Sequence, residues 1–139
     1  MTSRISHTTI DARDAYAQSV WWGQVLGMSE DPEDPNEPGH EECMIFSPDG
    51  RTRVLFIEVP EPKTDLKNRI HLDLRPTEGT RDQEVERLLG LGATVVADRR
   101  RPDGSGWFTL ADPEGNEFCV LRGDSEVTDP YAHLVTAPG

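Results

Sequence analysis

The chain has 139 residues, the length of one domain whose core needs no disulfide or metal to hold it. Its formal net charge of −12 at pH 7 makes nucleic acid and anionic membranes poor partners. No apolar run approaches the ~20 residues of a membrane span, and the first residues lack the apolar core of a signal peptide. Cys43 and Cys119 stand in apolar segments and are expected to be reduced, buried thiols, which favours a cytoplasmic protein.

The first half of the chain predicts a strand, a helix and two more strands. Asp11 is expected to cap the helix, and Gly27 to end it. The acidic, proline-rich segment Ser29 to Glu42 is predicted to be mostly loop, with room for a short strand at its start. The three clear strands are predicted at about Arg4 to Ile10, Cys43 to Phe46 and Arg53 to Val59.

The second half predicts the same order of elements. Its helix begins at a capping-box pattern, Thr80 with Gln83 three residues later, and ends before Gly92. Its strands are predicted at about Ile70 to Leu74, Ala93 to Ala97, Trp107 to Leu110 and Phe118 to Leu121. Each half is therefore a β-α-β-β-β module. We predict one domain over residues 1–122, with module one at about 4–59, a connector at 60–68, module two at about 69–122 and a tail at 123–139.

Landmarks of three kinds recur at nearly one spacing. His7 and His71 are 64 residues apart (71 − 7 = 64), and each opens a strand-like run. The helix-ending glycines and the turn prolines are each 65 residues apart, at Gly27 and Gly92 and at Pro48 and Pro113. The spacing predicts a duplicated module of roughly 60 residues, with a ligand cleft where the two histidines come together.

Several motifs carry a resemblance to a known superfamily. They are Trp21 to Gly27, Lys67 to Leu74, Leu91 to Ala93 and Gly106 to Leu121. With them the chain resembles the vicinal oxygen chelate superfamily of glyoxalases, bleomycin-resistance proteins and extradiol dioxygenases, and in particular the glyoxalase-like subgroup common in actinobacteria. The resemblance implies an α+β fold in which two βαβββ modules form a curled mixed sheet around a cleft. A homodimer is expected, because such sheets leave edges and apolar faces to cover.

The resemblance also implies a metal site, of which this chain matches half. Metal-dependent members use His, Glu, His and Glu from the first and last strands of each module. His7 and His71 match the histidines, whereas the acid position of module two falls on Cys119. The acid position of module one falls on Val54 or Leu55, and Glu58 would contribute only if it faces the cleft. A divalent Zn, Ni, Fe, Co or Mn ion on His7 and His71 is therefore one expectation.

The other expectation is a pocket without that ion. Both histidines, Asp73, Trp107 and Cys119 would then line a small-molecule pocket, with Trp107 stacking on a planar ligand. Asp73 shares a strand face with His71 and could orient it or act as a base. The run Arg99 to Arg101 has two readings, a solvated hairpin tip or a device that steers an anionic ligand.

Two functions follow from these expectations. The first is a glyoxalase-like protein that binds a small, aromatic or hydrophobic molecule in the cleft without the standard four-ligand metal site. The second is a metal-dependent lyase, isomerase or dioxygenase that uses His7 and His71 as ligands. The absence of both usual glutamates favours the first.

Overall fold

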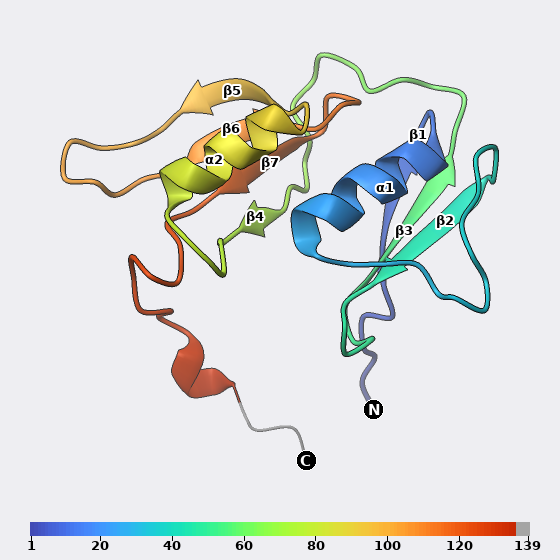
Figure 1. Cartoon of the computed structure of the whole chain (residues 1–139), viewed down its shortest axis with the longest axis horizontal. Coiled ribbons are helices and arrows are strands. Elements are labelled where there is room, and N and C mark those ends of the chain that lie inside the picture. The colour runs from blue at the N-terminus through green and yellow to red at the C-terminus, as the bar shows by residue number, and fades with distance from the viewer. Residues whose placement is uncertain (136–139) are drawn as a thin grey trace. The chain divides into compact units, whose positions relative to one another are not determined.

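The computed structural model describes residues 1–135 of the chain, which fall into two compact units (Figure 1). The first unit is Met1–Thr64 and the second begins at Asp65, so the boundary falls inside the predicted connector. Within residues 1–135, each unit carries one α-helix and its own sheet of parallel and antiparallel strands, which confirms the predicted α+β class. Over these residues, no helix has the length and hydropathy that crossing a membrane requires.

The first unit holds β1 (Thr8–Ala12), α1 (Ala15–Leu26), β2 (Glu42–Phe46) and β3 (Arg53–Glu58). Its sheet has the order β1-β3-β2, with β1 parallel and β2 antiparallel to β3. Helix α1 packs on one face of this sheet. The buried side chains of that face are Cys43, Ile45, Val54 and Phe56, and those of the helix include Ala15, Trp22 and Val25.

The start of α1 differs from the prediction. Strand β1 continues to Ala12, so Asp11 lies within the strand and Asp14 is the cap, accepting a hydrogen bond from the Ala17 amide at 3.0 Å. The predicted stop is confirmed, because Gly27 adopts a left-handed conformation with φ of 66°. Sequence reasoning chose the first of two available aspartates, and the strand displaced the cap by three residues.

The fourth strand expected in the first unit is reduced to one bridge. Ser29 and Phe46 exchange both backbone hydrogen bonds, at 3.0 and 2.8 Å, and the chain then leaves the sheet. Farther along the edge of β2, the Asn36 side chain donates to the Met44 carbonyl at 2.8 Å. A side-chain amide therefore takes the place that a strand would fill, and the unit is β-α-β-β.

The second unit keeps the full β-α-β-β-β order. Thr80 caps α2, and the predicted capping box with Gln83 is confirmed. Helix α2 contributes the buried Val85 and Leu88. Its elements are β4 (Asp73–Leu74), α2 (Arg81–Gly90), β5 (Thr94–Asp98), β6 (Phe108–Ala111), β7 (Glu117–Val120) and a 3₁₀ turn, Ala132–Leu134. Its sheet has the order β4-β7-β6-β5, with β4 parallel to β7 and the other pairs antiparallel.

The strand registers show that the two histidines are equivalent. Thr9 pairs with Leu55 in the first unit, and Asp73 pairs with Cys119 in the second, so both strands are offset by 64 (73 − 9 and 119 − 55). His7 and His71 each stand two residues before these positions, ahead of rather than inside the observed strands. Both strands were predicted to begin earlier than they do.

Hydrogen bonds also attach the segments of the second unit that precede β4 and follow β7. The Asn68 amide donates to Glu117 Oε2 at 3.2 Å, and the Asn68 side chain reaches Asn116. Glu126 Oε1 accepts from the backbone amides of Gly123 at 2.8 Å and Arg81 at 2.5 Å. The end of the predicted connector and the start of the predicted tail thus pack with the second unit.

Candidate functional site

A pocket of about 350 Å³ opens on one face of the second unit's sheet. Thr109 and Cys119 pair across β6 and β7 and point to this face, whereas Leu110, Phe118 and Val120 alternate with them and form the buried core. The lining residues are Lys67, His71, Asp73, Arg99, Trp107, Thr109, Cys119 and Leu121. Four of the predicted pocket residues, His71, Asp73, Trp107 and Cys119, therefore line one pocket.

The polar centre of this pocket is made by three side chains. His71 Nδ1 lies 3.2 Å from Asp73 Oδ1, so Nε2 is the ring nitrogen that does not contact Asp73. The Cys119 sulfur is 3.6 Å from Thr109 Oγ1. One donor atom from each of His71, Asp73 and Cys119 lies within 4.8 Å of the other two. The arrangement comes from the parallel pairing of β4 with β7, which sets Asp73 directly beside Cys119.

Cys119 is a neutral thiol in this setting. The side chain is only 6% exposed, and burial raises the pKa of the thiol above its ordinary value. The Thr109 hydroxyl partly offsets that rise in pKa, and the nearby Asp73 carboxylate adds to it. Both cysteines of the chain are free and buried, as predicted. A nucleophilic thiolate is therefore disfavoured at neutral pH.

A hairpin brings Trp107 to the pocket. The Arg99 amide donates to the Trp107 carbonyl at 2.8 Å, and the chain turns between them. Gly106 allows the close return, since a Cβ at this residue would lie 2.1 Å from the Arg99 carbonyl oxygen and its φ is +93°. No side chain fits there without moving the backbone.

Buried Arg81 holds the same hairpin from α2. Its side chain is 5% exposed, and Nη1 donates to the carbonyls of Gly106 at 3.0 Å and Gly104 at 3.1 Å. Nε donates to Asp82 Oδ1 at 3.0 Å. The first residue of the helix thus fixes the loop that presents Trp107.

The three arginines of the hairpin, Arg99 to Arg101, have different surroundings. Arg99 lines the pocket, and the guanidinium of Arg101 lies 5.8 Å from the centre of the Trp107 ring. Arg100 points elsewhere, pairing with Asp98 at 2.7 Å. Alternation along an extended chain gives this division.

The standard four-ligand metal site does not fit the side chains. Leu55, the equivalent of Cys119, is the residue at the first module's acid position and has no ligand atom. Glu58 alternates with Leu55 and shares the strand face of Val54 and Phe56, so it cannot replace that acid. A different set, His71, Asp73 and Cys119, is the one group within residues 1–135 whose donors are close enough together to hold an ion. Imidazole, carboxylate and thiolate together suit zinc or iron.

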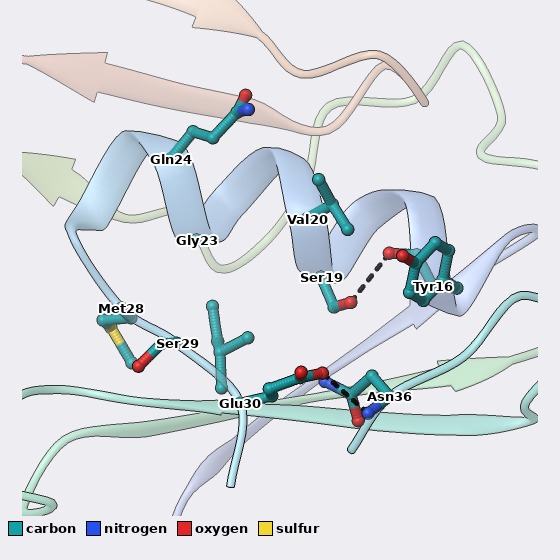
Figure 2. Close-up of a pocket in the computed structure, with 10 residues that line it drawn as sticks. Tyr16, Ser19, Val20, Gly23, Gln24, Met28, Ser29, Glu30 and Asn36 are labelled. Carbon is teal, nitrogen blue, oxygen red and sulfur yellow. Dashed lines mark hydrogen bonds between the residues drawn. The ribbon is translucent and has the colours of Figure 1, made fainter. Parts of the chain in front are cut away.

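The first unit has a second hollow, of about 330 Å³, between α1 and the edge of β2 (Figure 2). Polar groups in its lining are already hydrogen-bonded to other lining residues. Ser19 donates to the Tyr16 carbonyl at 2.7 Å, and Glu30 accepts from the Asn36 amide at 2.7 Å (Figure 2). Because Asn36 also holds the edge of β2, these contacts serve to dock the acidic loop. We therefore place the candidate site in the second unit.

Comparison with known protein families identifies the family of this chain. A model of the glyoxalase-like domain matches residues 7–121. The chain belongs to the glyoxalase-like domain family. The match runs from His7 to Leu121, and the predicted recognition of this superfamily is confirmed. No curated protein gave a significant match.

Solved structures of glyoxalase-like proteins share the fold. One of them is a point mutant of the fosfomycin resistance protein FosX from Listeria monocytogenes, complexed with Mn(II) and 1S,2S-dihydroxypropylphosphonic acid. It is 19% identical to this chain with a TM-score of 0.62, and the match covers 88% of this chain and 92% of that one. FosX from Mesorhizobium loti is 19% identical, with a TM-score of 0.60 and coverage of 87% and 92%. A glyoxalase/bleomycin resistance/dioxygenase family enzyme from Burkholderia phytofirmans is 22% identical, with a TM-score of 0.62 and coverage of 85% and 97%.

Sequence reasoning missed four residues of the site, namely Lys67, Thr109 and Leu121 in the lining and Arg81 on α2. Thr109 and Lys67 gave no signal, because a threonine in a strand and a lysine in a connector are ordinary. Arg81 was missed because an arginine in a first helical turn usually faces solvent, and its carbonyl partners lie more than twenty residues away. A periodic reading of α2 with Val85 and Leu88 would have found that Arg81 shares their buried side.

Proposed function

We propose that this glyoxalase-like protein binds a small aromatic molecule in the pocket of the second unit, without the standard four-ligand metal site. The observation that carries the proposal is the lining of that pocket. Trp107, Leu121 and the neutral Cys119 supply apolar surface, and Thr109 and His71 supply polar groups at its centre. Five of the eight lining residues are polar or charged, so it is the apolar wall of Trp107, Leu121 and Cys119 that favours an aromatic ligand.

The size of the pocket limits its ligand. Small-molecule sites span roughly 300–1,000 Å³, and this pocket, at about 350 Å³, is near the lower end. One or two fused rings would fill it. An indole ring at the wall is well suited to stack on such a ligand.

Binding of two-ring aromatic probes tests this proposal. We expect at least one of three naphthalene derivatives, one neutral, one anionic and one cationic, to shift the backbone amide resonances of Thr109 and Cys119 in an NMR titration. Trp107→Ala is expected to weaken binding about tenfold, because a stacking partner is lost. Tyr131→Ala is the matched control, since Tyr131 is 67% exposed and lines no part of this pocket. Equal losses in the two variants would contradict the proposal.

A second candidate function rests on the donor group at the centre of the pocket. A divalent ion held by His71, Asp73 and Cys119 would supply Lewis-acid chemistry to a substrate oxygen. Cys119 would have to lose its proton, and Asp73 would either bind the ion or orient His71 through Nδ1. A role for His7 as a further ligand stays a prediction.

Elemental analysis of protein purified without a histidine tag separates the two candidates. The first predicts substoichiometric metal, unchanged in His71→Ala and Cys119→Ser. One equivalent of metal that is lost in both variants and kept in Cys43→Ser would establish the second instead. Cys43 is the matched control because it is equally buried and lies in the first unit.

A further inference from the structure

We infer that the ligand of this pocket is a planar organic anion, a ring system bearing a carboxylate, sulfonate or phosphonate. The inference rests on the proposed function and adds a charge requirement to it. Lys67 and Arg99 supply that requirement, because both are cationic and both line the pocket.

The two cations enter from separate segments. Lys67 comes from the stretch before β4, which Asn68 fastens to Glu117 at 3.2 Å. Arg99 comes from the hairpin after β5, which is fixed by the backbone bond between Arg99 and Trp107. Both anchored segments thus deliver a positive charge to one opening, although their side chains are exposed.

Neither cation forms an ion pair with a carboxylate in the part of the chain that the structure describes. Within residues 1–135, ion pairs are seen for Arg81, Arg87 and Arg100, whereas neither Lys67 nor Arg99 takes part in one. The single carboxylate in the lining, Asp73, is engaged by His71. With the Asp73 carboxylate counted and His71 neutral, the two cations leave the pocket lining with a net charge of +1, in a chain whose net charge is −12.

The neighbouring arginines show that this placement is selective. Arg100 is paired with Asp98 and Asp82, and Arg101 lies over the Trp107 ring, so only Arg99 of the three offers an unpaired guanidinium to the pocket. An anion at the rim would meet Lys67 and Arg99, and its ring would extend toward Trp107 and Leu121. Charge attraction at such a rim chiefly sets ligand preference and association rate.

Isothermal titration with three probes of equal size tests the inference: 2-naphthoate, 2-naphthalenemethanol and 2-naphthylmethylammonium. We expect 2-naphthoate to bind at least fivefold more tightly than the alcohol, and the ammonium compound to bind most weakly. Arg99→Gln and Lys67→Gln are each expected to weaken naphthoate about fivefold and to leave the alcohol unchanged. Arg51→Gln, which removes the same charge from an exposed site in the first unit, is expected to change neither.

The outcomes separate this inference from the function on which it rests. If the alcohol binds as tightly as naphthoate, or if Arg99→Gln and Lys67→Gln match Arg51→Gln, the pocket stands and the anion preference is wrong. If none of the three probes binds, the proposed function and this inference both fail. Raising the salt from 50 to 500 mM is expected to weaken naphthoate alone, and equal salt effects on naphthoate and the alcohol would also overturn the inference.

Discussion

Replacement of Arg81 by methionine is the sharpest test of how the second unit holds its site. The side chain is 5% exposed, and its Nη1 is the donor that fastens the hairpin at Gly104 and Gly106. Methionine has a similar length, but it offers no donor. The change therefore removes hydrogen bonds with little loss of volume.

The magnitude follows from the bonds removed. Hydrogen bonds from a charged donor contribute about 1.5–3 kcal/mol each, and two bonds of good length are lost, so the gross loss is about 3–6 kcal/mol. Burying a thioether instead of a guanidinium returns about 1–2 kcal/mol. We expect Arg81→Met to lower the free energy of unfolding by about 3 kcal/mol.

Urea denaturation followed by tryptophan fluorescence measures this change. Arg87→Met is the matched control on the same helix, because Arg87 is 45% exposed and pairs with Glu84 on the surface. Its loss is expected to cost less than about 1 kcal/mol. A cost for Arg81→Met no greater than that of Arg87→Met would refute the idea that Arg81 positions the hairpin.

Two further predictions concern the same hairpin. Gly106→Ala is expected to destabilise the protein by at least about 2 kcal/mol more than Gly104→Ala in urea denaturation, because both have positive φ but only the former meets the Arg99 carbonyl; equal costs would contradict this. The pKa of Asp98 is lowered to about 2 by the Arg100 guanidinium, so its contribution to stability is present above pH 3.8 and is lost as pH falls through about 2. NMR titration of the Asp98 carboxyl should show that pKa, and Arg100→Gln should return it toward 3.8; an unchanged value would be a contradiction.

The repeat was readable from the sequence because it depends on local signals. A glycine that ends a helix and a proline that opens a turn can each be recognised from the local sequence, without knowledge of the tertiary structure. The offset is 65 at the turn prolines and 64 again in the strands that follow them. The turn after β2 spans residues 47–52 and its counterpart spans 112–116, so one extra residue restores the strand register of the first unit. That register identifies Leu55 as the equivalent of Cys119, a choice between Val54 and Leu55 that the sequence left open.

The parts that sequence reasoning missed depend on long-range contacts. The edge of β2 is completed by Asn36 through one bond to the Met44 carbonyl, so the short strand predicted at the start of Ser29 to Glu42 is reduced to the bridge at Ser29. The cationic rim could be predicted only in part, because the run Arg99 to Arg101 indicated a device that steers an anionic ligand but Lys67 gave no signal. Lys67 and Arg99 are 32 residues apart in the sequence (99 − 67 = 32), and no local pattern indicates that they line one pocket.

The most direct measurement for the central claim is calorimetric titration of 2-naphthoate into protein dialysed against EDTA and then returned to metal-free buffer. The account predicts one site per chain with the same affinity before and after chelation, because Trp107, Lys67 and Arg99 bind the ligand without an ion. Binding that is lost on chelation and restored by one equivalent of a divalent metal would contradict it.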